Sequence, residues 1–507
     1  MAVCSPHCSH QHSQALVTDK KTKRANQPDR RARNDTERQK PRDDNSVLPK
    51  PFDSEEIAAE DRRPKRKVAV LIGYSGTGYK GMQINTTEKT IEGDLFSAFV
   101  AAGAISKANA DDPKKSQLVR CARTDKGVHA AGNMISLKLI IEDEDIVEKI
   151  NSHLAPQIRV WGIERTIGSF SCYQSCDSRW YEYLLPSHAL LPPHPSSWLG
   201  KTLVETADEV GDREGYESRQ EEVKVFWAEV EERDIKPLLD NLDADIKDLV
   251  LKALYEEEAS NPDNEEKKPT AAAQTTTETA SDATATSAPS TEPGPSSPSK
   301  HNLPTASEVL SESEILSREQ KKRVEAAVKS LKHAYNAAKR NYRIPASRVE
   351  RLQAALTSYV GTRNYHNYTI LKTFRDPSSK RNIKSFLVNP EPKIIQGTEW
   401  LSLKVHGQSF MMHQIRKMVG MASLVVRSGC PIERIQESYA DVKTSIPKVP
   451  GLGLLLERPV FDSYNNLQAP KHGREKLDFG KWETKLEEFK QKEIYQRIFE
   501  EEGKENT

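Results

Sequence analysis

The sequence predicts an α+β fold, and three observations carry that prediction. Strand-like and helix-like patterns alternate between residues 68 and 163, in the order strand, helix, strand, helix, strand. A second ordered stretch, from residue 359 onward, again combines strands with an amphipathic helix. Between the two lies a long polar segment with too few apolar residues to form a core. We therefore expect two ordered halves separated by an insertion.

The first half, expected over residues 61–204, begins with the apolar run 68–74, which is typical of a buried strand. Thr90 is placed to cap a helix that ends at Gly103. Four apolar side chains share one face of that helix: Ile91, Leu95, Phe96 and Phe99.

The first half continues with an alternating run over residues 133–139, which predicts a second strand with its apolar side chains on one face. An amphipathic helix over 146–154 and a strand over 158–163 follow. This order of elements is typical of a split α+β unit.

The expected insertion, residues 205–356, has three parts. Residues 205–257 are acidic and helix-prone, and helical patterning returns over 305–356. Residues 258–302 contain no Ile, Val, Leu, Met, Phe, Tyr or Trp. Because such a segment cannot bury apolar surface, we expect the middle part, 258–304, to be disordered.

The second half, expected over residues 357–465, contains an alternating strand at 400–406. An amphipathic helix over 410–427 follows and ends at Gly429. The remaining residues, 466–507, form a tail with a charged helix that either packs on the core or stays mobile.

Residues 1–60 are polar, charged and almost free of aromatic residues, so we expect a disordered tail. Two basic runs, at 20–24 and 62–67, favour nuclear import over a plain solvated linker. Several side chains that could bind metal gather near the N-terminus: Cys4, His7, Cys8, His10 and His12. No second cluster with zinc-site spacing follows, so we expect no metal site.

The composition excludes several classes of protein. The formal net charge of the 507 residues is +1, so any affinity for nucleic acid must come from local basic clusters. No segment approaches the ~20 apolar residues of a membrane helix, and we expect no membrane association. Six cysteines in so long a chain do not make a disulfide framework, which fits a reduced, intracellular compartment.

The most informative stretch is residues 121–130, Cys-Ala-Arg-Thr-Asp-Lys-Gly-Val-His-Ala. It places the carboxylate of Asp125 on a short turn that Gly127 closes, just before a predicted strand. A carboxylate on such a turn is held rigidly, as a catalytic group must be. Taken alone, Asp125 is better explained as an ordinary turn residue, because Asp and Gly are common in turns. The complete run of residues 121–130 is not explained as an ordinary turn.

This run resembles the catalytic motif of TruA-type tRNA pseudouridine synthases, Arg-Thr-Asp-x-Gly-Val-His-Ala. Residues 179–183 resemble the family's Arg-x-Tyr-x-Tyr strand, and 408–420 resemble its Phe-x-x-x-x-x-Arg-x-(Met/Ile)-Val-Gly helix. Residues 361–368 resemble its Gly-Thr-His-Asp-Phe-x-Asn-Phe segment, with four positions changed. The matches cover roughly residues 68–200 and 357–465, and details such as Lys126 resemble the eukaryotic, fungal-like branch.

The resemblance implies roles for four residues. Asp125 is implied as the essential carboxylate, and Arg416 as the guanidinium that pairs with it. Tyr181 is implied as the active-site tyrosine that stacks on the target base. Arg123 is implied as the arginine that fills the gap left by the flipped-out base, with a simple phosphate clamp as the alternative.

The implied reaction breaks the N1–C1′ bond of uridine and joins C5 to C1′. A carboxylate can stabilise the electron-poor C1′, attack it, or help to remove a ribose proton. The family implies two ferredoxin- or RRM-like halves joined into one central, mostly antiparallel sheet flanked by helices, with the RNA cleft between them. It implies no cofactor and no metal, and a tRNA substrate, with small nuclear RNA and messenger RNA as further candidates. We favour a monomer.

Three alternatives stay open. The first is a non-catalytic tRNA-binding or tRNA-folding protein on the same scaffold, against which the intact Asp, Tyr and Arg set argues. The second is the sister synthase that acts on the anticodon stem-loop. A hydrolase that cleaves the same bond would release free uracil, whereas an isomerase would not.

Overall fold

The computed structural model describes residues 49, 51–85, 87–259 and 312–505. The metal-binding side chains near the N-terminus, most of the expected tail and residues 260–304 of the expected disordered segment lie outside these residues. None of the helices in the described part is both long and apolar enough to cross a bilayer.

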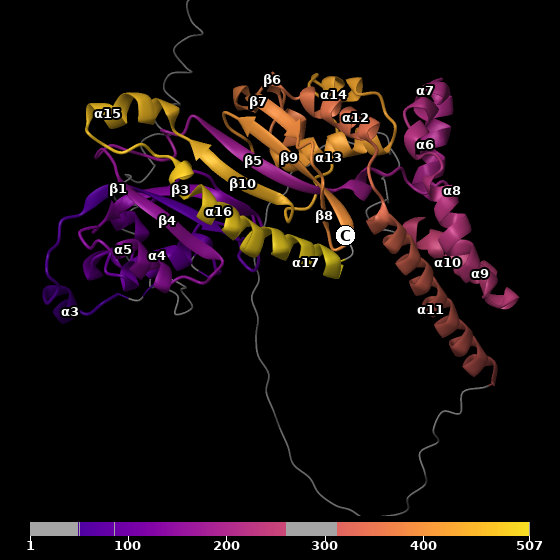
Figure 1. The fold of residues 1–507 in the computed structure, drawn as a ribbon, viewed down its shortest axis with the longest axis horizontal. Helices are drawn as coiled ribbons and strands as arrows, with labels where there is room; N and C mark the ends of the chain where they lie inside the picture. The colour runs from indigo at the N-terminus through magenta and orange to yellow at the C-terminus, as the bar shows by residue number, and fades with distance from the viewer. Residues whose placement is uncertain (1–48, 50, 86, 260–311, 506–507) are drawn as a thin grey trace, which may run out of the picture.

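Within the described residues, one mixed sheet forms the centre of the molecule (Figure 1). Its strands follow one another in space in the order β4-β1-β3-β10-β5-β9-β7-β6, with β2 beside β3 and β8 beside β9. The strands are β1 (Arg66–Tyr74), β2 (Val119–Arg120), β3 (His129–Leu139), β4 (Ile158–Arg165), β5 (Ser178–Pro186), β6 (Gly361–Asn364), β7 (Lys380–Val388), β8 (Lys393–Ile395), β9 (Thr398–Gly407) and β10 (Leu454–Val460).

The two halves meet at β10, which comes from the second half and lies between β3 and β5. It pairs parallel to β3 through Leu455 opposite His129 and Leu456 opposite Ala130, and antiparallel to β5. Every other strand pair is antiparallel among the described residues. The predicted α+β fold with one mostly antiparallel sheet is therefore confirmed.

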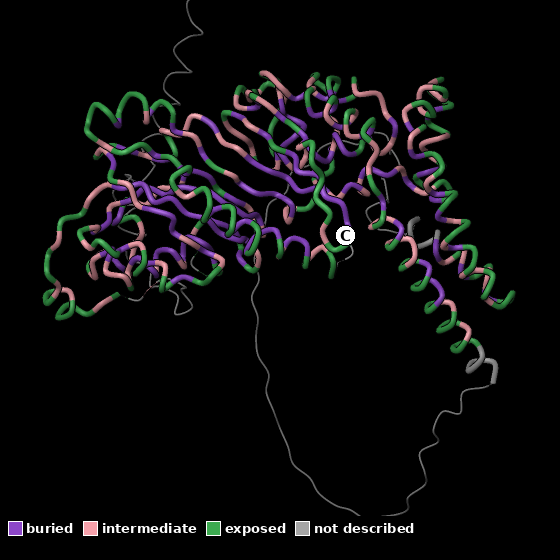
Figure 2. The backbone as a smooth tube through the Cα atoms, in the orientation of Figure 1, coloured by how far each residue is buried: buried purple, intermediate pink, exposed green. Residues whose placement is uncertain are grey.

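Helices cover both faces of the sheet, and the strands are the most continuously buried part of the chain (Figure 2). One face packs on α4 (Ile91–Ala101), α5 (Ile146–Ser152), α12 (Ala346–Thr357) and α13 (Gln414–Arg427). The other face packs on α16 (Glu483–Phe489), the π-helical turn η11 (Lys490–Tyr495) and α17 (Gln496–Glu505). The C-terminal helix thus packs on the core, which settles the alternative that the sequence left open.

Further helices complete the described residues, and two of them each bury one side chain in these cores, Ile435 and Ala469. These helices are α3 (Ser54–Ala58), α6 (Trp198–Glu209), α7 (Arg213–Ser218), α8 (Phe226–Val230), α9 (Lys236–Asp240), α10 (Ala244–Ala259), α11 (Glu312–Asn341), α14 (Glu433–Glu437) and α15 (Ala469–Lys471). Residues of α8, α10 and α11 share a small apolar cluster of their own, and these helices form an arm at the right of Figure 1.

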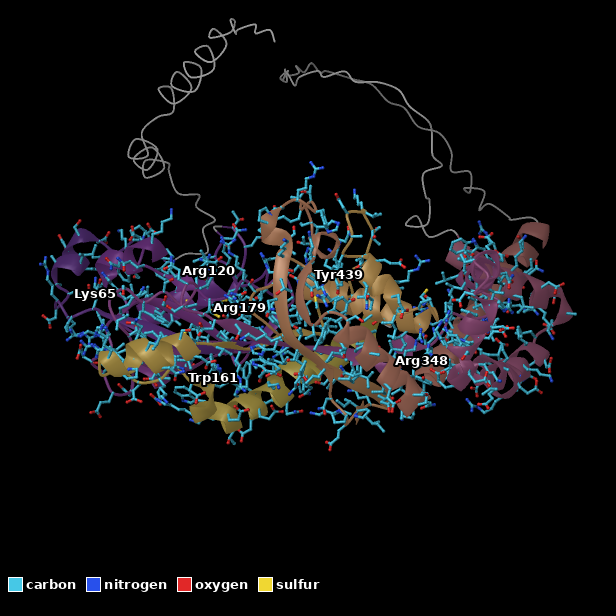
Figure 3. All side chains as sticks on the ribbon, turned by 90° about the horizontal axis from the view of Figure 1, so that it is seen from above. Lys65, Arg120, Trp161, Arg179, Arg348 and Tyr439 are labelled. Carbon is cyan, nitrogen blue, oxygen red and sulfur yellow. The ribbon has the colours of Figure 1, made fainter. Side chains whose placement is uncertain are left out.

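Two segments differ from the sequence-based expectation. Residues 54–58 lie in the tail that was expected to be disordered, yet they form α3. A capping box of Asp53 and Glu56 caps the N-terminus of this helix. Helix α12 was expected within the insertion, but its apolar side chains join the main core. Arg348 of α12 is fully buried, donates to the carbonyls of Leu190 and Val426, and pairs with Glu222 at 3.0 Å (Figure 3).

Candidate active site

A cleft of about 1100 Å³ opens between the two halves, bounded by residues 118–128, by β5 and by residues 408–416. Six cationic side chains line it: Arg120, Arg123, Arg179, Lys380, Arg381 and Arg416. Arg120 and Arg179 are labelled near the centre of Figure 3. Asp125 is the one carboxylate among the described residues of the lining. A cleft with this charge attracts a polyanion.

Asp125 lies on the turn between β2 and β3. The N–H of Val128 donates to the Asp125 carbonyl oxygen at 3.1 Å, and Gly127 takes the positive φ of 76° that closes the turn. The carboxylate itself is 40% exposed and faces the cleft. The turn therefore presents Asp125 to anything that enters the cleft.

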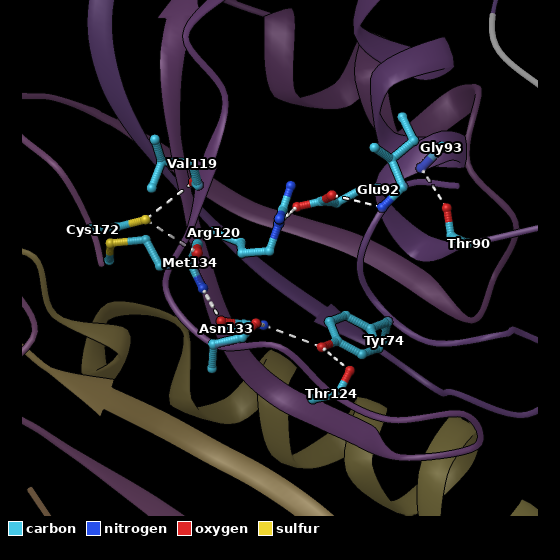
Figure 4. A network of polar contacts seen from close by, with 12 residues as sticks. Tyr74, Thr90, Glu92, Gly93, Val119, Arg120, Thr124, Asn133, Met134 and Cys172 are labelled. Carbon is cyan, nitrogen blue, oxygen red and sulfur yellow. Dashed lines mark hydrogen bonds and ion pairs between the residues drawn. The ribbon is translucent and has the colours of Figure 1, made fainter. Parts of the chain in front are cut away.

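Buried hydrogen bonds fix the segment just before Asp125 (Figure 4). The Tyr74 hydroxyl lies 2.9 Å from Thr124 Oγ1, and Asn133 Nδ2 donates both to Tyr74 Oη and to the Ala122 carbonyl, each at 3.1 Å. The N–H of Met82 donates to the Thr124 carbonyl at 3.2 Å. Burial raises the pKa of Tyr74, so its hydroxyl stays neutral. The network holds the turn that carries Asp125 in one position.

His129, the histidine of the motif, has a structural role. It is fully buried, and its Nδ1 accepts the N–H of Gly76 at 3.2 Å. Burial lowers the pKa of His129 to about 4, so the ring is neutral at physiological pH. Gly76 lies close to the turn that carries Asp125. A Cβ added to Gly76 would sit 2.3 Å from the Val128 carbonyl oxygen.

We expect Gly76→Ala to lower kcat by about 100-fold, because the methyl group would push the turn that carries Asp125 out of place. The matched control is Gly78→Ala in the same loop. Gly78, unlike Gly76, has a positive φ, of 82°, so its alanine variant carries backbone strain, but an added Cβ there meets nothing within 4 Å. Single-turnover rates and melting temperatures of both variants separate misplacement from general loss of stability. Equal kcat values for the two variants would contradict the prediction.

Tyr181 lies in the middle of β5, opposite Leu456 of β10 and Val405 of β9. Its ring is 8% exposed, meets Phe410 edge-on at 5.2 Å and lines the cleft. Burial raises the pKa of Tyr181, and the nearby Asp125 charge adds to this effect. The side chain therefore offers a flat face and a protonated hydroxyl beside the carboxylate.

Arg123 is exposed at the cleft, two residues before Asp125. Among the residues that the structure describes, no hydrogen bond or ion pair engages its guanidinium, although its charge partly offsets the burial that raises the pKa of Glu92. Arg120 differs, because it forms an ion pair with the fully buried Glu92. Arg123 is thus free to meet a ligand, whereas Arg120 is held in place.

Arg416 does not form the expected ion pair with Asp125. Within the described residues, its Nε donates to the Val449 carbonyl at 2.7 Å. The guanidinium still lies near the turn that carries Asp125, since both border the same point at Gly451. A Cβ added to Gly451 would sit 3.5 Å from Arg416 Nη1 and 3.6 Å from the carbonyl oxygen of Lys126, which follows Asp125. The cleft therefore contains all four predicted residues, but the Asp125 carboxylate has another partner.

That partner is His413, which the sequence reasoning missed. Its Nδ1 lies 3.1 Å from Asp125 Oδ2, although the two groups are not aligned as a hydrogen bond. The sequence predicted a helix over 410–427, which would place His413 inside it. In the structure α13 begins at Gln414, because His413 has a positive φ of 61°. The available signal was a histidine three residues before Arg416, within the stretch that resembles the family's helix.

Comparisons with known proteins identify the family. Residues 355–462 match the family model described as tRNA pseudouridine synthase. The chain is 44% identical over 461 residues to tRNA pseudouridine synthase 1 of Schizosaccharomyces pombe, covering 89% of this chain and 83% of that protein. It is 41% identical over 432 residues to tRNA pseudouridine synthase 1 of Saccharomyces cerevisiae, covering 85% and 67%.

A more distant relative is the tRNA pseudouridine(27/28) synthase of Saccharomyces cerevisiae, at 33% identity over 397 residues, covering 78% of this chain and 84% of that protein. These identities extend over most of the chain and confirm the resemblance found in the motifs, including the resemblance to the fungal-like branch. The chain therefore belongs to the TruA-type tRNA pseudouridine synthase family.

Proposed function

We propose that this protein converts uridine to pseudouridine in tRNA, with Asp125 acting at C1′ of a flipped-out nucleotide. The observation that carries the proposal is the placement of Asp125: a carboxylate on a fixed turn, exposed in a cleft whose other charged side chains are cations. The relatives at 41–44% identity are named tRNA pseudouridine synthase 1, which supports the same reaction.

The geometry gives each group a task in that reaction. The cations of the cleft bind RNA phosphates, and the Tyr181 ring supplies a face on which the extruded base stacks. Arg123 occupies the gap that the base leaves. The N1–C1′ bond then breaks, C5 bonds to C1′, the hydrogen on C5 leaves as a proton, and N1 takes one up.

The relatives also bear on the alternatives. A non-catalytic binding protein would not need an exposed carboxylate in a cationic cleft, where it weakens attraction for phosphates. The sister synthase is less similar, at 33% identity against 41% for the synthase 1 of the same organism. We therefore favour target uridines like those of the synthase 1 relatives.

An unmodified tRNA transcript tests the reaction. Incubation with the protein should produce pseudouridine at discrete positions, detected as carbodiimide adducts that stop reverse transcription, without release of free uracil. Free uracil would indicate a hydrolase. Tight binding without modification or uracil release would favour the non-catalytic protein.

The proposal extends to small nuclear RNA and messenger RNA as further substrates, because the lining cations contact phosphates, which every RNA carries. Mapping pseudouridine on transcripts of both classes tests this extension. Modification confined to tRNA would remove it.

We also propose that the protein enters the nucleus through the basic run at residues 20–24. In the other run, Arg63 pairs with Asp143 at 2.8 Å and Arg66 with Glu142 at 3.3 Å, so these cations are already engaged. Replacing the cations of 20–24 with alanine in a fluorescent fusion should shift the protein to the cytoplasm. Unchanged nuclear accumulation would contradict this assignment.

A further inference from the structure

The residue just before α13 has an unusual backbone. His413 adopts φ 61° and ψ 3°, the left-handed region that non-glycine residues seldom enter. Its carbonyl oxygen still accepts the N–H of Lys417 at 3.0 Å, so His413 starts the helix without belonging to it. Such backbone strain tends to persist where function requires it.

Contacts with a neighbouring segment hold this strained turn. Thr369 Oγ1 donates to the Met412 carbonyl at 2.9 Å, and Lys417 Nζ donates to the Asn367 carbonyl at 3.1 Å. The Gln414 side chain accepts the N–H of Met411 at 2.9 Å. The backbone on both sides of His413 is therefore anchored, and its side chain is directed toward the Asp125 turn.

The imidazole and the carboxylate face each other at the cleft. His413 Nδ1 lies 3.1 Å from Asp125 Oδ2, with the His413 side chain 16% exposed and the Asp125 side chain 40% exposed. Within the described residues no other group forms an ion pair with this carboxylate. Arg416, the expected partner, is bonded to the Val449 carbonyl instead.

We propose that His413 is a positioning residue for the reaction: its Nδ1–H donates to Asp125 Oδ2 and fixes the orientation of the carboxylate toward C1′ of the bound uridine. The inference rests on the proposed function of Asp125. A small rotation of the imidazole would align the hydrogen bond, and such bonds often tighten only when substrate is bound.

The surroundings keep this ring neutral at physiological pH. Burial lowers the pKa of His413 from 6.5, and the Lys448 and Arg416 charges lower it further, while Asp125 raises it. The neutral ring donates one hydrogen bond without placing a full positive charge beside the carboxylate. Asp125 thus keeps its negative charge available to the electron-poor C1′.

Two substitutions separate the hydrogen bond from the backbone conformation. Glycine and asparagine both tolerate a positive φ, but only asparagine places an amide N–H where Nδ1 stands in histidine. We expect His413→Gly to lower the single-turnover rate constant by about 10- to 100-fold, the range for losing a hydrogen bond to a charged group. His413→Asn should stay within about threefold of the wild type, and the tRNA Kd should change in neither variant.

The pH dependence gives a readout that a structural role would not change. In the wild type, kcat should fall as the pH drops through the lowered pKa of His413, because the imidazolium then competes with C1′ for the carboxylate. In His413→Asn this fall should disappear. An active Gly variant, or an Asn variant as impaired as Gly, would overturn the proposal. Inactive wild-type protein would instead refute the proposed function, so the two failures are distinguishable.

Discussion

Asp125→Asn is expected to abolish turnover, with kcat at least about 10⁴-fold below the wild type, while the tRNA Kd stays within about twofold. The amide keeps the size of the side chain but cannot stabilise or attack the electron-poor C1′. Binding is preserved because it comes from the cations of the cleft. Removing a negative charge from that cleft can only leave RNA affinity unchanged or raise it slightly.

The matched control for this substitution is Asp441→Asn, an exposed aspartate outside the cleft lining. Its kcat and Kd should equal those of the wild type. Single-turnover kinetics and filter binding on the same tRNA give both quantities. Parallel loss of activity and binding in Asp125→Asn would show that the residue supports the structure of the cleft.

Lys490→Met is expected to destabilise the folded protein by about 3–5 kcal/mol, because it leaves the buried Glu182 and the partly buried Glu457 without their cation. Lys490 Nζ lies 2.7 Å from Glu457 Oε1 and 3.5 Å from Glu182 Oε2, beneath the C-terminal helices. The side chains of Lys490 and Glu182 are only 6% and 4% exposed. The Tyr495 hydroxyl donates to Glu182 Oε2 at 2.5 Å, but it brings no charge.

The loss of stability should depend on pH in a defined direction. Burial alone would raise the pKa of Glu182, but Lys490 and the hydrogen bonds to the carboxylate hold it below 4.5. The wild type therefore has this stabilisation above pH 4.5 and loses it as the pH falls toward the lowered pKa. Without Lys490, both carboxylates destabilise the folded protein at neutral pH, where they are charged. They destabilise it less once they are protonated.

Urea unfolding at pH 7.5 and pH 5 measures this effect. The difference between Lys490→Met and the wild type should be larger at pH 7.5. Lys492→Met, two residues away and exposed in the same helical turn, should behave as the wild type at both values. An equal shift in the Lys492 variant would mean that the buried network contributes little to stability.

Local patterns predicted most of the elements that surround the site. Thr90 caps α4 through the N–H of Gly93, and the alternating run 133–139 lies within β3, as predicted. The arrangement of strands was not accessible to local patterns. The parallel pairing of β10 with β3 joins residues more than 300 positions apart through only two residue pairs, and only the family resemblance implied a joined sheet.

At the site, too, local motifs predicted some features and tertiary packing determined others. The motif pointed to Asp125, and the resemblance pointed to Tyr181, Arg123 and Arg416, all of which line one cleft. The histidine contact could not be predicted, because helical periodicity is blind to a single residue with positive φ. The positive φ of His413 delays the start of the helix to Gln414 and directs the His413 side chain toward Asp125. The hydrogen bond from Arg416 to Val449 likewise depends on tertiary packing.

Tritium release from tRNA that carries [5-³H]uridine tests the central claim most directly, with wild type and Asp125→Asn assayed side by side. Joining C5 to C1′ must expel the hydrogen on C5, so each turnover releases one tritium to water. Release by the wild type and none by the variant, at equal tRNA binding, is the predicted result. Equal release by both proteins, or none by either despite tight binding, would contradict the account.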